Sequence, residues 1–414
     1  MSASTAIVAT KDAFEKTGLK TSHGSFNLPS HQARTQFVPT SEIVRNFTAN
    51  STSSWSTYSE FVLTPDQLPD VVDRFTLALT MGAGSMTGGT YINLVNDASF
   101  LSRLIEVSIG GELVSSLYPE NGYVRNVLHL TTEEKFKVLP AAGNKLVATR
   151  KTNCAAGQTL YVNLPIPWVQ KYGWFSKSQQ AQIRIKIYHA DLSSIVNTDG
   201  TVPVLPINSV SLNVSGRQYL DQANVSALVS MQRKLGKVDE RFLDVVQQQI
   251  TLVSGSTSYT AQLTNFIGNF DHVLFVVRAA TSIGTALGND PSAFVAVSSY
   301  NFKDSAGNLV MPETASAYAL GPYLDKFVIG DGTDVAGGLG TTQKYVYPLF
   351  FGSRPSEALS KGTQHGFYKM SGLDKLNLTF ASALSAIYVV DVIGYAWANI
   401  SADANGQVKK SLVV

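Results

Sequence analysis

The chain has 414 residues, of which 44% are apolar and 15% are charged, and its formal net charge is +2. This length is enough for two domains that each bury their own core. The near-neutral charge argues against a generally basic surface for nucleic acid. The single cysteine, Cys154, excludes an intramolecular disulfide framework and any multi-cysteine metal site. The low charge density favours a chain that covers much of its surface with copies of itself.

Residues 1–55 are rich in Ser, Thr, Asn and Ala and show little periodicity. They cannot bury enough apolar surface to fold alone, so we predict an amino-terminal arm that becomes ordered on a neighbour or a surface, with a disordered tail as the alternative. The arm begins with neither a basic leader nor a long apolar run, so we expect no secretory signal. No segment reaches the roughly 18 apolar residues of a membrane-spanning helix.

The first domain, residues 56–218, is organised around a hairpin. Alternating residues on both sides of Gly110-Gly111 predict two strands, the second of which is Glu112–Leu117. After Pro119 the apolar spacing becomes three and four residues, which predicts a short helix. Further strands are predicted at Tyr58–Leu63, Val71–Thr80, Lys145–Lys151, Leu160–Pro167, Ile183–Tyr188 and Val210–Val214.

The same order of elements returns in residues 249–414. An alternating segment (294–302), a turn with Gly307, a short strand and a helical pattern after Pro312 repeat the hairpin and helix, although residue identity between the halves is low. Residues 219–248 are predicted as the connector, with a helix in KVDERFLDVVQQQ (237–249), and the tail 402–414 is predicted to be exposed. We therefore predict an all-β chain of two tandem eight-stranded jelly-roll sandwiches, with short helices in the loops and the connector.

Two long apolar runs in the second half, 273–280 and 387–400, are interrupted by Arg278, Asp391 and Asn399. Their length and composition predict buried strands.

The residue types that carry catalysis or bind metals do not form a convincing constellation. None of the six histidines belongs to an H-x-H pair, and His129 with Glu133 gives two ligands without a third. The strand carboxylates Glu106 and Asp391 are isolated, unlike the paired carboxylates of glycanases. Asp331–Asp334 is short of an EF-hand loop. We predict no catalytic, cofactor-binding or metal-binding residues, and we predict that the protein is not an enzyme.

The sequence also contains six N-x-S/T sequons, at Asn46, Asn50, Asn213, Asn224, Asn377 and Asn399. We interpret them as a result of the high content of Asn, Ser and Thr and do not predict glycosylation.

The order of these segments resembles that of the double jelly-roll major capsid proteins of tailless icosahedral double-stranded DNA viruses. That family includes tectivirus-like phages, nucleocytoplasmic large DNA viruses and, more distantly, adenovirus hexon. The resemblance rests on the hairpin at Phe100–Leu113, the strand pair in 64–79, the paired strands 160–170 and 182–190, and the start of the connector at 214–221. The resemblance in pattern covers about three quarters of the chain. The order of the segments is more specific than any single motif.

The resemblance implies a homotrimer whose six jelly rolls form a pseudo-hexagonal capsomer of an icosahedral virion capsid. Its partners would be neighbouring capsomers, penton and minor capsid proteins, and an internal lipid membrane facing the amino-terminal arm, with no direct contact to nucleic acid. Synthesis in the host cytoplasm is also implied.

Two other interpretations are open. A two-domain carbohydrate-binding or receptor-binding sandwich protein would use Trp168, Trp174 and Tyr172 as stacking platforms. The coat protein of an RNA virus would need a more basic arm than residues 1–55, which hold five Lys or Arg against three Asp or Glu.

Overall fold

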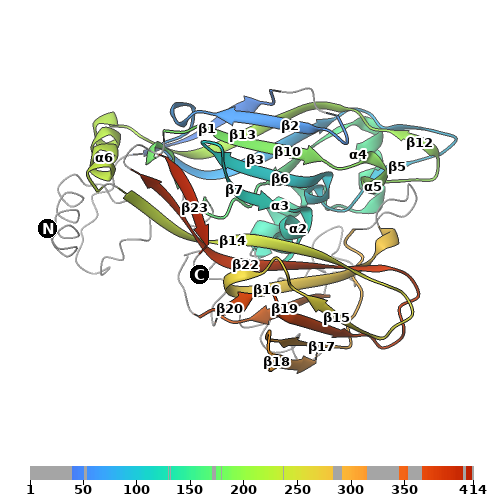
Figure 1. The fold of residues 1–414 in the computed structure, drawn as a ribbon. Helices are drawn as coiled ribbons and strands as arrows, with labels where there is room; N and C mark the ends of the chain where they lie inside the picture. The colour runs from blue at the N-terminus through green and yellow to red at the C-terminus, as the bar shows by residue number, and fades with distance from the viewer. Residues whose placement is uncertain are drawn as a thin grey trace.

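The computed structural model consists of two β-sandwiches that lie side by side (Figure 1). The strands pair antiparallel throughout the part of the chain that the structure describes. The described residues are 40–50, 54–128, 130, 132–169, 174–178, 180–235, 237–282, 291–314, 345–352, 366–403 and 407–412.

The first sandwich has two principal sheets. One has the order β1 (Thr40–Thr48), β13 (Ile207–Tyr219), β3 (Val71–Met81), β8 (Gln158–Asn163), and the short β9 (Trp174–Phe175) also pairs with β3. The other has the order β2 (Tyr58–Leu63), β10 (Ile183–His189), β6 (Ser102–Ile109), β7 (Glu112–Leu117).

The second sandwich is built in the same way. Its first sheet has the order β14 (Lys237–Leu252), β22 (Tyr388–Asp403), β16 (Ile267–Ala279), β19 (Val346–Phe350), with β20 (Tyr368–Ser371) beside β16 and β23 (Val408–Leu412) beside β22. Its second sheet has the order β15 (Ser258–Gln262), β21 (Lys375–Thr379), β17 (Ser299–Lys303), β18 (Leu309–Thr314).

The strand order is identical in the two halves. When the eight principal strands of each half are numbered along the chain, the sheets of both halves have the orders 1-8-3-6 and 2-7-4-5. This interleaving of early and late strands is the jelly-roll arrangement, so the predicted all-β tandem jelly-roll fold is confirmed.

Helices and two small sheets fill the connections of the first sandwich and the link between the halves. The helices are α2 (Pro119–Leu128), α3 (Thr132–Ala141), α4 (Val147–Ala156), α5 (Leu192–Ile195) and α6 (Gln222–Leu235), with short 3-10 turns η1 (Pro65–Gln67), η2 (Ala98–Leu101), η3 (Ser176–Ser178) and η4 (Ala280–Ser282). The small sheets are β5 (Ile92–Leu94) with β11 (Val196–Thr198), and β4 (Ser85–Thr87) with β12 (Thr201–Val204).

The predicted central hairpin and the helix after it are present. Gly110 and Gly111 have φ values of 60° and 91°, which glycine adopts without the penalty of a side chain, and they join β6 to β7. The chain then enters α2 at Pro119, whose fixed φ suits the first turn of a helix. In the helix predicted after Pro312, the first two residues, Glu313 and Thr314, belong to β18, and the remainder lies outside the described residues.

Two local predictions are wrong. The segment 145–151 was expected as a strand but enters α4, whose Cys154 side chain is buried and whose body packs against β5. The segment 237–249 was expected as a helix but belongs to β14, which pairs with β22 from Lys237↔Asp403 to Leu252↔Tyr388. In both cases tertiary pairing or packing outweighs a weak local preference. The tail 402–414 is mostly exposed, as predicted: of its described residues only Val408 is buried, and β23 pairs with the end of β22.

The first strand, β1, lies within the segment predicted as the amino-terminal arm. It forms an edge of its sheet and pairs with β13 from Thr40↔Tyr219 to Thr48↔Ser211. Residues 1–39 of the predicted arm lie outside the described residues.

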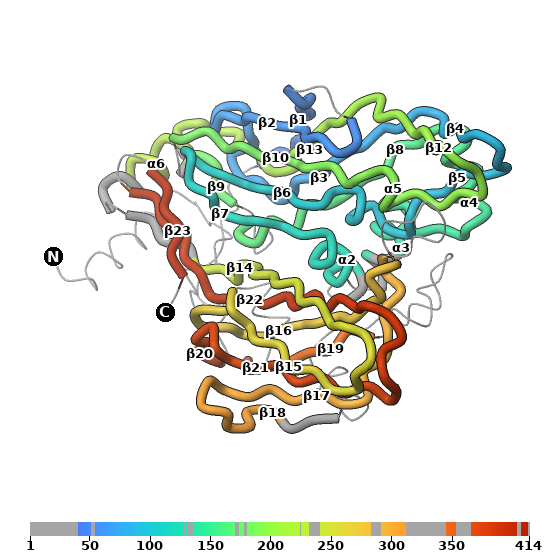
Figure 2. The backbone as a smooth tube through the Cα atoms, turned by 45° about the vertical axis from the view of Figure 1, so that its right-hand side comes forward, coloured from blue at the N-terminus to red at the C-terminus, as the bar shows by residue number. Residues whose placement is uncertain are grey.

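One continuous hydrophobic core passes through both sandwiches. It includes the largest buried side chains of each half, among them Trp168 and Phe75 in the first and Trp397 and Phe270 in the second. The backbone trace turned by 45° shows α2 between the two sandwiches (Figure 2). The two halves therefore share buried apolar surface, which is the main stabilising contribution to their association.

Candidate functional site: the joint between the two sandwiches

The aromatic residues considered for carbohydrate stacking are not available for that role. Trp168 and Trp174 are 1% and 5% exposed, and the Trp168 ring packs edge-on against Phe242 of the second sandwich at 5.8 Å. Tyr172 lies outside the described residues. A stacking platform has to present a ring face to solvent, and these two rings do not.

The other residues considered for chemistry remain separate. Glu106 accepts a hydrogen bond from the Tyr188 hydroxyl at 3.0 Å, and Cys154 is buried inside α4, where burial raises the pKa of its thiol. His129 and Asp331–Asp334 lie outside the described residues, as does the side chain of Glu133.

Two buried histidine pairs look like fragments of catalytic arrangements. The Ser59 hydroxyl lies 2.7 Å from Nε2 of His189, and Nδ1 of His272 lies 2.8 Å from Asp271. All four side chains are at most 1% exposed, so a substrate cannot reach them in this structure. Both pairs are better explained as polar groups that pair with each other within the core.

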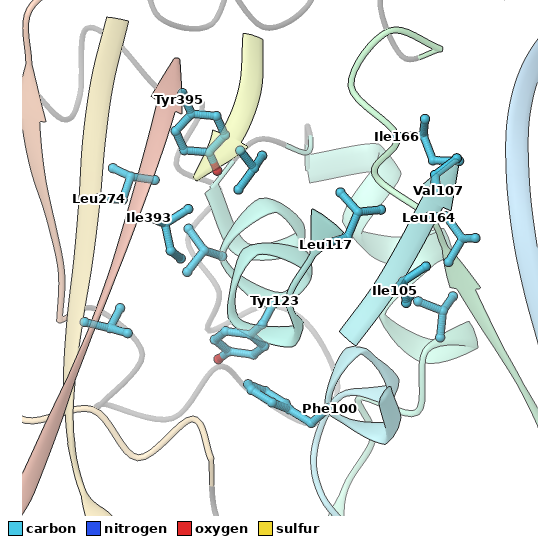
Figure 3. Packing of buried hydrophobic residues seen from close by; sticks show 14 of the residues in the cluster. Phe100, Ile105, Val107, Leu117, Tyr123, Leu164, Ile166, Leu274, Ile393 and Tyr395 are labelled. Atoms are coloured by element: carbon cyan, nitrogen blue, oxygen red, sulfur yellow. The ribbon is translucent and has the colours of Figure 1, made fainter. Parts of the chain in front are cut away.

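The most elaborate polar arrangement lies at the joint, which we define as α2 together with the strands β14, β16 and β22 against which it packs. The apolar face of α2 carries Tyr123, whose ring lies 5.3 Å from that of Phe100 and 5.8 Å from that of Phe294. Figure 3 shows α2 between Leu274 and Ile393 of the second sandwich and Ile105 of the first.

An ion cluster lies at the first turn of α2. One terminal nitrogen of Arg278, on β16, lies 2.5 Å from Glu120 on α2 and 2.9 Å from Asp391 on β22. A second Arg278 nitrogen donates to the Pro291 carbonyl at 3.0 Å. Arg278 and Asp391 are 3% and 0% exposed, so these charges are nearly desolvated. We call these three residues the triad; its Glu120 comes from the first sandwich and the other two from the second.

Two glutamines of β14 also donate hydrogen bonds to the triad. The Gln247 amide donates to Glu120 at 3.0 Å, and the Gln249 amide donates to Asp391 at 2.9 Å. Burial and the nearby Glu120 charge raise the pKa of Asp391 to about 7, although Arg278 acts in the opposite direction. One cation therefore faces two carboxylates in a place where an unpaired charge is unfavourable.

A cleft of about 510 Å³ opens beside the triad. Its lining includes residues of both sandwiches, among them Arg103, Tyr118, Gln248 and Asn265. The cleft gives solvent a route to the Glu120 side of the triad, while Asp391 stays buried.

Further polar contacts hold the joint at other points along α2 and β14. Tyr395 on β22 donates its hydroxyl to Asn121 of α2 at 2.9 Å. Asp244 on β14 forms an ion pair with Lys410 of β23 and accepts a 3.5 Å contact from Ser115 of β7. The Tyr395–Asn121 and Ser115–Asp244 contacts join residues of different sandwiches, so they help to fix the position of one sandwich on the other.

The triad could not be predicted from the sequence, although the sequence contains a partial signal. Arg278 and Asp391 are the charges that interrupt the two long apolar runs, and a charge in a buried strand requires a partner. Glu120 precedes Arg278 by 158 residues, so sequence spacing could not identify it as that partner.

Within the described part of the chain, no group of three or more His, Cys, Asp or Glu side chains is placed to hold a metal ion. No helix among the described residues is long and apolar enough to cross a membrane.

Several solved structures with the same fold are capsid proteins of viruses. The structure of PBCV-1 VP54, fitted into a reconstruction of the virophage Sputnik, is 12% identical and has a TM-score of 0.65 over 91% of this chain and 97% of its own. The Faustovirus major capsid protein is 9% identical, with a TM-score of 0.64 over 94% of this chain and 93% of its own. The mavirus major capsid protein is 10% identical, with a TM-score of 0.51 over 96% of each chain.

Neither a protein-family model nor a curated protein matches the sequence. The likeness is therefore one of architecture, and it extends over nearly the whole of each chain. Together with the repeated strand order, it shows that this chain has the double jelly-roll fold of viral major capsid proteins.

Proposed function

We propose that the chain is a major capsid protein that trimerises into pseudo-hexagonal capsomers of an icosahedral virion. The observation that carries this proposal is the pair of sandwiches with one strand order, fixed side by side by the joint. Three such chains present six similar sandwiches. A ring of three chains therefore has exact threefold symmetry and a nearly sixfold outline. The low charge density supports burial of the flanks against other copies.

The proposal extends to domains, partners and location. Residues 1–55 would contribute an arm from which β1 joins the first jelly roll (56–218). Residues 219–248 would connect the halves and include the start of β14, which joins the second jelly roll (249–414). The capsomer would contact neighbouring capsomers, penton and minor capsid proteins, and an internal membrane on the side of the arm. A net charge of +2 supports a shell without direct contact to nucleic acid. The role is structural, without catalysis, and the protein would be made in the host cytoplasm.

Light scattering of the purified full-length protein tests the central claim. The expected mass is three times the chain mass of 44.6 kDa, and negative-stain images of the same fraction should show particles of hexagonal outline. A monomer that persists at high protein concentration would contradict the proposal.

The carbohydrate-binding alternative is not favoured, because Trp168 and Trp174 are buried. Quenching of tryptophan fluorescence by micromolar glycan in a titration would support the carbohydrate-binding alternative.

A further inference from the structure

The triad has an imbalance of charge that the rest of the joint does not correct. From α2 it receives the Glu120 carboxylate, from β16 the Arg278 guanidinium and from β22 the Asp391 carboxyl, while β14 supplies only the neutral amides of Gln247 and Gln249. The other charged residue of α2, Arg125, interacts with Tyr395. With both carboxylates ionised, the buried cluster carries one surplus negative charge.

We propose that the triad is an acid-strengthened clamp between the two sandwiches: a proton taken up by Asp391 removes the surplus charge and tightens α2 on β16 and β22. This inference concerns contacts within one chain and does not depend on the capsid proposal. The clamp joins Glu120 of the first sandwich to Arg278 and Asp391 of the second. A stronger clamp therefore holds the two sandwiches more firmly in their relative position.

The pH range follows from the direction of the shift. Burial and Glu120 raise the pKa of Asp391 to about 7 in the folded chain, above its ordinary value of 3.8. The folded state therefore binds more protons than the unfolded state between these values. The stabilisation is fully present below 3.8 and is lost as the pH rises through about 7. Acidification from pH 8 to pH 5 should therefore strengthen the joint.

Asp391→Asn tests the clamp, because an amide mimics the neutral carboxyl at every pH. Between pH 5 and pH 8 the unfolding equilibrium constant of the wild type should rise about a hundredfold relative to that of the variant, from roughly two pH units of linkage. Asp66→Asn, at an exposed aspartate of the first sandwich, is the matched control and should not change the pH dependence. Equal pH dependence in wild type and Asp391→Asn would overturn the proposal.

Two further measurements show where in the chain the pH-dependent stabilisation occurs and which group takes up the proton. Hydrogen exchange of the α2 amides, corrected for intrinsic rates and compared with β2, should accelerate in the wild type between pH 5 and pH 8 but not in Asp391→Asn. Infrared difference spectra over the same range should show a protonated carboxyl band that the variant lacks. Should Asp391→Asn fail to fold, Glu120→Gln serves instead. It removes the charge that repels Asp391, so the carboxyl band should disappear at lower pH, and an unchanged band would refute the clamp.

Discussion

Burial favours the neutral form of both His189 and Asp391, but it shifts their pKa values in opposite directions. His189 is 1% exposed, and its Nε2 lies 2.7 Å from the Ser59 hydroxyl. The rings of His189 and Trp55 are nearly perpendicular, with their centroids 6.2 Å apart. Burial lowers the pKa of His189 to about 4, so the neutral imidazole is the folded form. Asp391 is also favoured as a neutral group, but for an acid this means a raised pKa and the opposite dependence on pH.

His189→Gln should therefore reduce acid destabilisation. Between an ordinary histidine pKa of 6.5 and the folded value of about 4, the unfolded chain binds the extra proton, so wild-type stability falls as the pH falls through this range. The loss is about 3 kcal/mol at most. Urea titrations at pH 4.5 and pH 7 should show a smaller difference in the variant. Ser59→Ala, which keeps the imidazole, should retain the wild-type difference in stability between pH 4.5 and pH 7. If this variant lost that difference, the pH dependence would come from the Ser59–His189 hydrogen bond and not from burial of the imidazole.

At the level of elements, the sequence predicted the hairpin, the helix after it and most of the central strands, because their alternation is regular and glycines or prolines bound them. It missed the first strand of both sandwiches. The sequence of β1, TSEIVRNFT, belongs to a half-exposed edge strand, and its outward residues are too polar for a clear apolar pattern. In β14, Phe242, Leu243, Val245 and Val246 fit helical spacing as well as strand spacing, and only pairing with β22 decides between them.

The two glycines of the β6–β7 turn should differ in their tolerance of a side chain. At Gly111 an added Cβ meets no atom within 4 Å, so Gly111→Ala should cost about 1 kcal/mol from its positive φ alone. At Gly110 the added Cβ would approach the Ala181 side chain to 2.9 Å, so Gly110→Ala should cost more. Chemical denaturation would measure both. Gly111→Asn is the control and should cost less than Gly111→Ala, since asparagine tolerates this conformation; the reverse order would contradict the explanation by φ.

At the scale of the whole molecule, the continuous core predicts that the two sandwiches unfold together. Calorimetry of the wild type should give one transition whose calorimetric and van't Hoff enthalpies agree. Tyr123→Ala removes the ring that links Phe100 to Phe294 and should lower stability by about 3–5 kcal/mol and broaden or split the transition.

Phe302→Ala is the matched control, because this residue is buried within the second sandwich beside Phe351 and Tyr368. It should lower the midpoint and keep a single transition. Two resolved transitions in the wild type would mean that the joint does not couple the halves.

The joint also has a consequence for solubility. β7 and β14 are terminal strands of their sheets, and each would present a row of unpaired backbone groups to solvent if its sandwich stood alone. They lie against each other, and β23 crosses beside them (Figure 2). Opening the joint would uncover two strands able to recruit strands from other chains. Failure of the joint should therefore lead to irregular fibrils or precipitate more readily than to a pair of independent soluble domains.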